Sequence, residues 1–426
     1  MHLFRRLPRT IRTPTEHIDI SMDFQSDICI IGNGAIGKTA ALGFAQAGAS
    51  VTLVDARPDG AAQGRSMPGP DDWDQRVYAI NPHAKALLSG LRVWDALDAS
   101  RVCQVDAMQV HGDAGAHAGQ VGFDAYGARV GALAWIVEDR NLNMALDAAL
   151  KFAVNVRLAS GSAQSVQIDD TAATVRLADG SMLRSELLIG ADGANSWVRA
   201  QADIDIDYRA YGQRAVVTNF ATELPHHGVA SQWFTAAEGI VALLPLAGNR
   251  VSLVWSAPDA LADVLLAESG DSSAALAARL QAYCGATLGQ LQPIGNVPPR
   301  AFALSLMRPH AITAPRLALV GDAAHVIHPL AGQGMNLGFA DIAALLAAVA
   351  GRGTHRDHGD ARVLSQYARA RKEDILLMQL ATDGLQRLFA ADLEPLRIAR
   401  NIGMNLIDRI PFIKRRLIGH AMGSKV

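Results

Sequence analysis

An aspartate and a glycine-rich turn follow an apolar strand in the segment 317–341, and together they could hold an anionic or polyhydroxylated ligand. The strand 317–320 ends at Gly321 and Asp322, where a carboxylate can accept hydrogen bonds from a polyol. A helix begins after the next turn with Gly332, Gln333 and Gly334. The two glycines let backbone N–H groups approach a ligand closely, and the helix directs its positive end toward that ligand. We therefore predict stabilisation of negative charge on a bound group.

A GxGxxG motif lies in the setting that dinucleotide binding needs. It follows the apolar strand 27–31 and precedes a helix, a second strand at 50–54 and Asp55. The motif glycines are Gly32, Gly34 and Gly37. The first glycine allows a tight turn, the second lets the backbone approach a pyrophosphate, and the third lets the helix pack on the strand. Asp55 can accept hydrogen bonds from ribose hydroxyls. Lys38 opposes the helix dipole, so it is expected either beside the pyrophosphate or as a solvated side chain.

A third constellation is the segment 187–199, an apolar strand that ends in a Gly-Ala-Asp-Gly turn and enters a short helix. Asp192, followed by Gly193, can cap that helix and orient backbone groups toward a phosphate. A helix cap without a ligand is the alternative, and the two roles are compatible.

The composition favours a large α/β protein without a nucleic-acid partner. The chain has 426 residues, is 50% hydrophobic and carries a net charge of −2, which allows two intertwined domains with a sizeable core. Parallel strands are predicted at the three motifs. Alternating strands of an antiparallel sheet are predicted at 214–220, 229–234, 240–245 and 250–256. The chain after residue 341 is predicted to be mostly helical, with segments at 367–380 and 382–389.

Cysteine and histidine positions give no metal or disulfide signature. Cys29, Cys103 and Cys284 lie far apart and form no CxxC pair, which fits a reduced cytosolic compartment. The pair His226-His227 has no third ligand at metal spacing and is predicted to lie in a surface turn. No window reaches the roughly 18 uninterrupted apolar residues of a membrane span. The polar segment 1–23 is predicted to be a disordered extension, with a targeting leader as the alternative.

The string GDAAHxxxPxAGQGMNLGxxD at 321–341 resembles the flavin-binding signature of the group A flavoprotein aromatic hydroxylases, especially their ubiquinone-biosynthesis branch. The resemblance implies that Asp322 binds the ribityl chain of FAD and that 332–334 faces the pyrimidine side of the flavin. It also implies that Arg76, in the string QRVYAI, contacts the ribityl and ring region. The alternative for Arg76 is a surface arginine.

Two further motifs match the same family. Arg140 stands at a helix start where the family places a cofactor-contacting arginine, although an ion pair with Glu138 or Asp139 is the alternative. The Asp192-Gly193 turn resembles the family's Asp-Gly motif, which is linked to both FAD and nicotinamide binding.

The implied activity is a monooxygenase reaction with bound FAD and with NAD(P)H and O₂ as co-substrates. Oxygen is transferred to an electron-rich aromatic ring, which needs neither a metal nor a protein nucleophile, so no catalytic acid or base is named. The strings RVYAI, LRVWDAL and LLPLAGNRVSLVW favour the ubiquinone branch. The implied substrate is a lipid-like polyprenylated phenol or benzoquinol, without a specified ring carbon.

The implied fold is a Rossmann-like FAD-binding domain with an inserted antiparallel-sheet substrate domain, like that of para-hydroxybenzoate hydroxylase, and a helical C-terminus. The expected parts are the extension at 1–23, the FAD-binding domain at 24–104, 130–205 and 301–360, the substrate domain at 105–129 and 206–300, and the helical region at 361–426.

Three other functions are compatible with the same motifs. A hydroxylase of a small soluble phenol would share every cofactor motif, as would a flavin-dependent oxidase or a non-catalytic flavoprotein assembly subunit. The basic amphipathic stretch 397–416 favours contact with a membrane surface or with other ubiquinone-biosynthesis proteins, and packing on the FAD domain is the alternative. The expected location is cytoplasmic, with a peripheral position at the inner membrane face if that contact exists.

Overall fold

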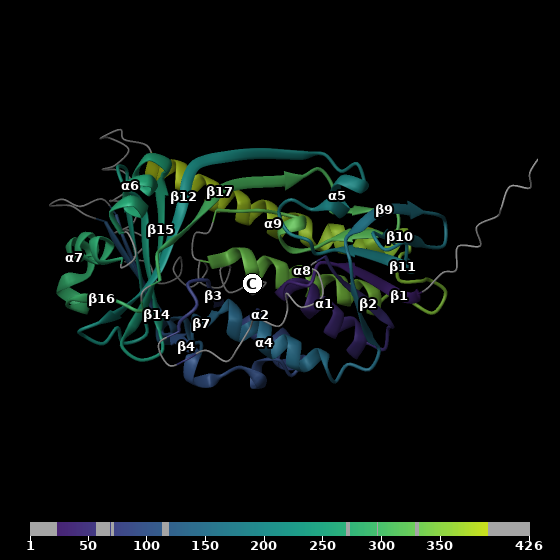
Figure 1. Ribbon diagram of the computed structural model, residues 1–426, viewed down its shortest axis with the longest axis horizontal. Coiled ribbons are helices and arrows are strands. Elements are labelled where there is room, and N and C mark those ends of the chain that lie inside the picture. The colour runs from purple at the N-terminus through teal and green to yellow at the C-terminus, as the bar shows by residue number, and fades with distance from the viewer. Residues whose placement is uncertain are drawn as a thin grey trace, which may run out of the picture.

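The structure is a computed structural model that describes residues 24–56, 69, 72–112, 119–269, 273–295, 297–328 and 332–390. The predicted extension at 1–23 and the basic stretch 397–416 lie outside the described residues. Within those residues the chain forms two eight-stranded sheets and one three-stranded sheet. Figure 1 shows the two large sheets at opposite ends of the molecule, with helices between them.

The first sheet has a parallel centre that carries the three sequence motifs. Its strands are β1 (Phe24–Ile31), β2 (Val51–Asp55), β8 (Val156–Ser160), β9 (Ala163–Ile168), β10 (Ala173–Leu177), β11 (Met182–Gly190), β18 (Thr313–Ala314) and β19 (Leu317–Leu319). The order is β18-β19-β11-β1-β2-β8, and β9 and β10 extend it beside β11. The pairs from β19 to β8 are parallel. The second half of β1, residues 28–31, is buried, which explains its continuous apolar sequence.

Helices cover this sheet and fill the middle of the molecule. They are α1 (Ala35–Gln46), α2 (Pro82–Gly90), α4 (Asp139–Leu150), α5 (Trp197–Gln201), α8 (Gln333–Ala350) and α9 (Ala361–Ala390). By length and composition α8 could cross a membrane, but 44% of it is buried within the protein. Phe339, Ile342 and Leu345 of α8 belong to the main hydrophobic core. We therefore assign α8 to the core.

The second sheet is mostly antiparallel. Its strands are β5 (Ala107–His111), β6 (Gln120–Asp124), β12 (Ile206–Thr222), β13 (Val229–Thr235), β14 (Gly239–Leu246), β15 (Arg250–Pro258), β16 (Leu291–Pro293) and β17 (Arg300–Pro309). The order is β16-β12-β15-β14-β13-β5-β6, with β17 also paired to β12. Side chains such as Val241, Leu243 and Trp255 pack under α6 (Asp259–Ser269) and α7 (Ala274–Leu288). The opposite face of the sheet lines a cavity, which is described with the active site below.

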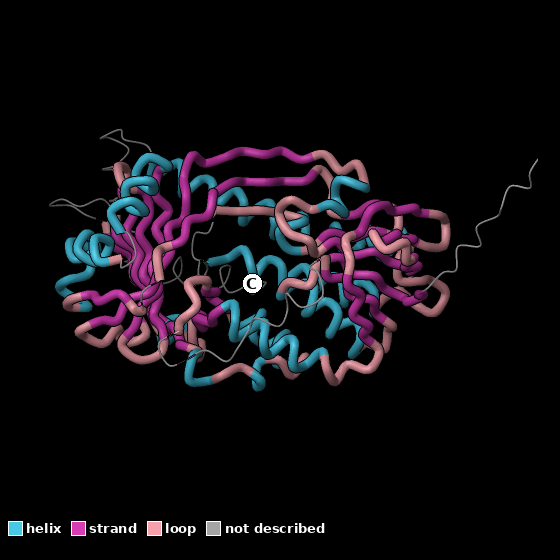
Figure 2. Tube along the Cα trace, in the orientation of Figure 1, coloured by secondary structure: helices cyan, strands magenta, loops and turns pink. Residues whose placement is uncertain are grey.

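A small sheet and several short helices join the two large sheets. The small sheet consists of β3 (Val77–Ile80), β7 (Ala134–Glu138) and β4 (Cys103–Val105), in that order. The short helices are α3 (Ala125–Ala128), η2 (Trp94–Ala96), η3 (Ala99–Arg101) and η4 (Gly321–Ala323). The ribbon of β12 and β17 runs along one edge from the second sheet toward the first (Figure 2).

The structure differs from the sequence expectations in three places. The two helical segments expected at 367–380 and 382–389 form one continuous helix, α9. Helix α6 was not predicted. Strand β17 crosses the expected domain boundary at residue 300, because it pairs with β12 over most of its length. The remaining domain boundaries stay predictions.

Candidate active site

The three sequence motifs meet at one edge of the first sheet, since each follows the carboxyl end of a parallel strand. Gly32, Asp192 and Asp322 come shortly after β1, β11 and β19, and Asp55 is the last residue of β2. Backbone hydrogen bonds join these ends, from Gly32 N to Val54 O at 3.1 Å and from Val320 N to Gly190 O at 3.0 Å. The carboxyl edge of such a sheet is where ligands of open α/β folds bind.

Each glycine of the GxGxxG motif has a different environment. Gly32 has φ +117°, and a Cβ there would lie 2.2 Å from Ala191 O. A Cβ on Gly37 would lie 1.8 Å from Gly32 O. A Cβ on Gly34 would meet no protein atom within 4 Å among the described residues. Gly32 and Gly37 are therefore required by packing, whereas Gly34 faces open space at the start of α1.

The start of α1 has no side-chain cap, which leaves its positive end available to an anion. Lys38 does not lie beside that anion site, nor is it solvated, so both expectations for it are wrong. It is buried, donates to Asn143 Oδ1 at 3.2 Å and forms an ion pair with Asp147. The cause is the packing of α1 against α4, which carries both partners and turns the lysine inward.

Polar atoms around this turn point to a missing hydrogen-bonding partner. Asn33 Nδ2 donates to Asp55 Oδ2 at 2.9 Å. Asp192 Oδ2 accepts from Val198 N in the first turn of α5 at 3.0 Å, but the N-cap residue of that helix is Ser196 rather than the predicted Asp192. Asn33 Oδ1 and Asp192 Oδ1 are buried without a hydrogen-bond partner in the described part of the chain. Gly193 has φ +85° and adjoins open space. Buried acceptors of this kind are normally satisfied, so a bound ligand is expected here.

The turn η4, which carries Asp322, is fixed from behind by a buried carboxylate. Asp341 of α8 accepts from Gly321 N at 2.9 Å and contacts His325 Nε2 at 2.7 Å. Its other oxygen accepts from Arg371 Nε of α9 at 2.7 Å. Burial would raise the pKa of Asp341, but His325 and Arg371 outweigh burial and lower it. Two helices thus hold the turn in place.

Asp322 itself is available to a ligand. Its side chain is exposed, yet neighbouring groups surround the carboxylate closely enough that desolvation raises its pKa, against the opposing effect of His325 and Arg76. The Asp322 carboxylate is therefore accessible from solvent but partly enclosed by protein groups, as in a concave site. Hydrogen-bond donors of a polyol would favour its charged form.

The start of α8 is tied to β3, which brings Arg76 close to the second glycine-rich turn. Asn336 Nδ2 donates to Ala79 O at 2.8 Å, and Asn336 Oδ1 accepts from Asn81 N at 3.0 Å. Gly332 has φ +64°, and α8 has no side-chain cap. A Cβ on Gly334 would meet no described protein atom within 4 Å. Asn336 was not singled out in the sequence, because its partners lie about 255 residues away.

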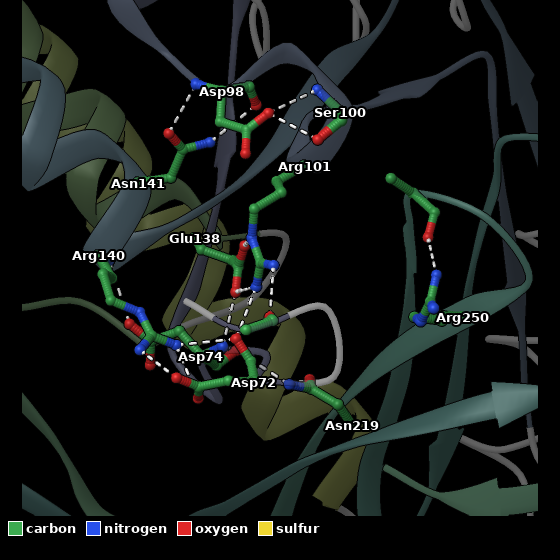
Figure 3. Close-up of polar contacts among 12 residues, drawn as sticks. Asp72, Asp74, Asp98, Ser100, Arg101, Glu138, Arg140, Asn141, Asn219 and Arg250 are labelled. Atoms are coloured by element: carbon green, nitrogen blue, oxygen red, sulfur yellow. Dashed lines mark hydrogen bonds and ion pairs between the residues drawn. The ribbon is translucent and has the colours of Figure 1, made fainter. Parts of the chain in front are cut away.

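Arg140 is engaged by an acid that the sequence did not suggest. Its guanidinium pairs with Asp72 at 2.7 Å, and not with Glu138 or Asp139 (Figure 3). Glu138 instead forms a buried ion pair with Arg101, with Nε and Oε2 2.7 Å apart. Neither ion pair was predicted, because the partners lie 68 and 37 residues apart in the sequence. The cofactor contact of Arg140 stays a prediction.

An apolar cavity of about 300 Å³ lies between the Arg76–Gly332 region and the second sheet. The sheet contributes alternate residues from one face, including Ala215, Val217, Ile240, Ala242, Leu244 and Val254. Arg76, Val77, Ala79 and Gly332 form the opposite wall. Mostly apolar cavities of this size with a few polar groups are typical small-molecule sites.

Comparison with known proteins decides the family. The FAD binding domain family model matches residues 25–376. Ubiquinone hydroxylase UbiL of Rhodospirillum rubrum is 34% identical over 406 residues, covering 95% of this chain and 91% of the relative. The chain belongs to the FAD-dependent aromatic hydroxylases. Among these hydroxylases, the 3-demethoxyubiquinol 3-hydroxylase of Escherichia coli is 35% identical over 405 residues, covering 93% of this chain and 98% of the relative.

The fold agrees with this membership. The crystal structure of PqsL, a probable FAD-dependent monooxygenase from Pseudomonas aeruginosa, superposes with a TM-score of 0.70 at 23% identity. The match covers 89% of this chain and all of PqsL. The expected fold, a Rossmann-like FAD-binding part with an antiparallel sheet, is confirmed.

The residues at the site fit the FAD of this hydroxylase family. Open space at Gly34 and the uncapped start of α1 suit a pyrophosphate. The carboxylates of Asp55 and Asp322 suit the ribose and ribityl hydroxyls, and the open start of α8 at Gly334 suits a group that gains negative charge. The individual contacts stay predictions. FAD, when bound, supplies the redox chemistry with NAD(P)H and O₂.

A group of potential metal ligands lies at the other end of the first sheet. Asp27, Glu186 and His358 each offer an atom within 4.8 Å of the others. Glu186 already contacts His358 Nδ1 at 2.6 Å, and Asp27 accepts from Ser50 N at 2.7 Å. These contacts account for the cluster without an ion.

Proposed function

We propose that this hydroxylase uses NAD(P)H and O₂ to hydroxylate the aromatic ring of a polyprenylated phenol or benzoquinol intermediate of ubiquinone biosynthesis. The observation that carries the proposal is the apolar cavity between the Arg76–Gly332 wall and one face of the second sheet. The names of the two relatives, both of which span nearly this whole chain, support the assignment to ubiquinone precursors.

The protein's contribution is binding, orientation and exclusion of water. The apolar side chains of the second sheet would hold an aromatic ring against the wall formed by β3 and the start of α8. The positive end of α8 would stabilise negative charge that develops beside it. The apolar lining limits the entry of water that would divert the reaction. No protein side chain is assigned as an acid or base.

Deletion of the gene tests the pathway assignment. Profiling of quinone intermediates should show that a polyprenylated ring lacking one hydroxyl accumulates, since its hydroxylation has stopped. The wild-type gene should restore the normal profile, whereas a Gly34→Val gene should not. An unchanged quinone profile in the deletion strain would contradict the assignment and favour a small soluble phenol as substrate.

Turnover should be independent of metal ions, because the proposed chemistry resides in FAD and the described residues that line the cavity include no His, Cys, Asp or Glu. We expect NAD(P)H-dependent hydroxylation to be unchanged after dialysis against EDTA. The measurement is product formation before and after dialysis, with FAD content as the control. Loss of turnover that added iron restores would show that the proposed chemistry is wrong.

The basic stretch 397–416 supports a further part of the proposal, a peripheral contact with an anionic membrane surface that delivers the lipid substrate. The stretch contains six basic residues and only one acidic residue, with apolar residues between them in the sequence. Each basic residue near such a surface contributes about 1 kcal/mol of binding free energy. We therefore expect the full chain to float with anionic liposomes at low salt. A partner protein that holds the substrate is the other source of contact.

Two variants make the flotation assay decisive. A chain truncated after Leu396 should lose flotation, and so should a full-length chain with the six basic residues of 397–416 changed to glutamine. Bound FAD in each variant serves as the control for folding. If the variants float as the wild type does, or the wild type does not float at low salt, the membrane contact is ruled out.

A further inference from the structure

The proposed substrate cavity contains an amide side chain whose orientation is fixed by the protein. Gln75 lines the cavity and is only 7% exposed. Its Nε2 lies 2.9 Å from Pro298 O. A carbonyl oxygen can only accept, so the atom beside Pro298 must be the NH₂ group of the amide. The Gln75 atom left over is therefore the carbonyl oxygen, Oε1.

That remaining oxygen lacks a partner. Gln75 Oε1 is buried and accepts no hydrogen bond from any described residue. It adjoins a cavity whose sheet wall is mostly apolar, with Gln232 and Ser256 as the polar exceptions among the described lining residues. A buried acceptor without a hydrogen bond lowers the stability of the fold, so this oxygen is well placed to bind a hydrogen-bond donor of a ligand.

The backbone on either side of Gln75 is held firmly, which makes this acceptor preorganised. Asp74 N donates to Glu138 Oε1 at 2.6 Å, and Asp74 O accepts from Asn219 Nδ2 at 2.9 Å (Figure 3). Arg76 N donates to Asp74 Oδ1 at 3.0 Å. These contacts tie the backbone that carries Gln75 to β7 and to the second sheet, and the bond to Pro298 O orients its amide.

We propose that Gln75 Oε1 accepts a hydrogen bond from a ring hydroxyl of the substrate and thereby selects a free phenolic hydroxyl over a methoxy or quinone oxygen. The inference rests on the proposed function, because it takes the cavity as the substrate site. A methoxy or carbonyl oxygen has no hydrogen to donate, so each would leave Oε1 unpaired in the complex. Gln75 is thus a specificity-determining residue with no part in the chemical step.

The test compares two ligands that differ only at the phenolic oxygen, which carries a hydrogen in one and a methyl group in the other: 2-(3-methylbut-2-enyl)phenol and its methyl ether. Each is titrated into FAD-loaded wild-type protein, and the dissociation constant is read from the change in flavin absorbance. We expect the phenol to bind roughly ten- to a hundredfold more tightly, since only the phenol pairs the buried acceptor. Equal binding of the two ligands would overturn the assignment of Gln75 while leaving the proposed function intact.

Variants separate the hydrogen bond from the extra bulk of the ether. Gln75→Met removes the acceptor at similar size, so the preference for the phenol should fall to near one while FAD content stays unchanged; Gln75→Leu is the substitute if Gln75→Met is insoluble. Gln232→Met is the matched change in the same cavity, and it should keep the preference. A preference that persists in Gln75→Met, or that disappears only in Gln232→Met, would overturn the inference. If FAD-loaded wild type binds neither ligand, the phenol assignment of the proposed function fails as well.

Discussion

Gly34→Val should produce a folded protein that binds no FAD. Gly34 has φ −84° and ψ −179°, which any residue can adopt, and a Cβ there meets no described protein atom within 4 Å. The change should therefore cost the apo protein no more than about 1 kcal/mol of folding free energy, the scale of a lost helix cap. The new side chain would occupy the space in which the motif places a pyrophosphate.

The measurement is flavin content after purification and after incubation with excess FAD. The matched control is Gly90→Val, at a glycine that also adjoins open space. Gly90 O accepts from Gln46 at the far end of α1, about 18 Å from Gly34 by helix rise. Gly90→Val should retain FAD, and circular dichroism should show that both variants fold. Full flavin occupancy in Gly34→Val would refute the dinucleotide site at this turn.

Asp322→Ala should weaken FAD binding by roughly ten- to a hundredfold. A carboxylate that accepts from a polyol contributes about 1.5–3 kcal/mol, and alanine removes it completely. The loss should be specific to binding, because the turn is held by the contacts of Asp341 with Gly321 N and His325 rather than by the Asp322 side chain. The dissociation constant of FAD is measured by fluorescence titration of apo protein.

Asp322→Asn is the graded control, since asparagine keeps an acceptor oxygen but loses the charge. Its affinity for FAD should lie between those of the wild type and Asp322→Ala. Unchanged FAD affinity in Asp322→Ala would show that the ribityl contact is misplaced and that the turn after β19 serves another purpose.

The sequence predicted the elements whose signals are local. The strand, turn and helix around the GxGxxG motif were predictable because each glycine acts on its immediate neighbours. The parallel strands were predictable because both of their faces are buried. The strands of the second sheet were predictable as apolar runs, and strands such as β14 are mostly buried on both faces, one under α6 and α7 and the other along the cavity. The carboxyl-edge location of Asp192 and Asp322 then followed from the rules of parallel sheets.

The interactions that escaped prediction are those between distant segments. Lys38 was expected at the surface or beside a phosphate, but it pairs with Asp147 of α4. Arg140 pairs with Asp72, which lies 68 residues earlier in the chain. Asp341, which holds η4 in place, pairs with Arg371, and only the packing of α8 against α9 brings these two residues together. The free acceptor on Gln75 depends on Pro298, 223 residues away. No local pattern encodes such partners, since they depend on how the sheets and helices pack.

The most direct test of the proposed activity is isotope transfer from ¹⁸O₂ to a polyprenylated phenol. Purified protein with FAD and NAD(P)H should give a product whose new hydroxyl carries ¹⁸O, in step with NAD(P)H oxidation. Gly34→Val should give no labelled product. If the wild-type protein consumes NAD(P)H and O₂ but the ring gains no ¹⁸O, the chain is a flavin oxidase and not a hydroxylase. If it holds FAD but neither consumes NAD(P)H nor labels the ring, it is a non-catalytic flavoprotein, and the central claim fails.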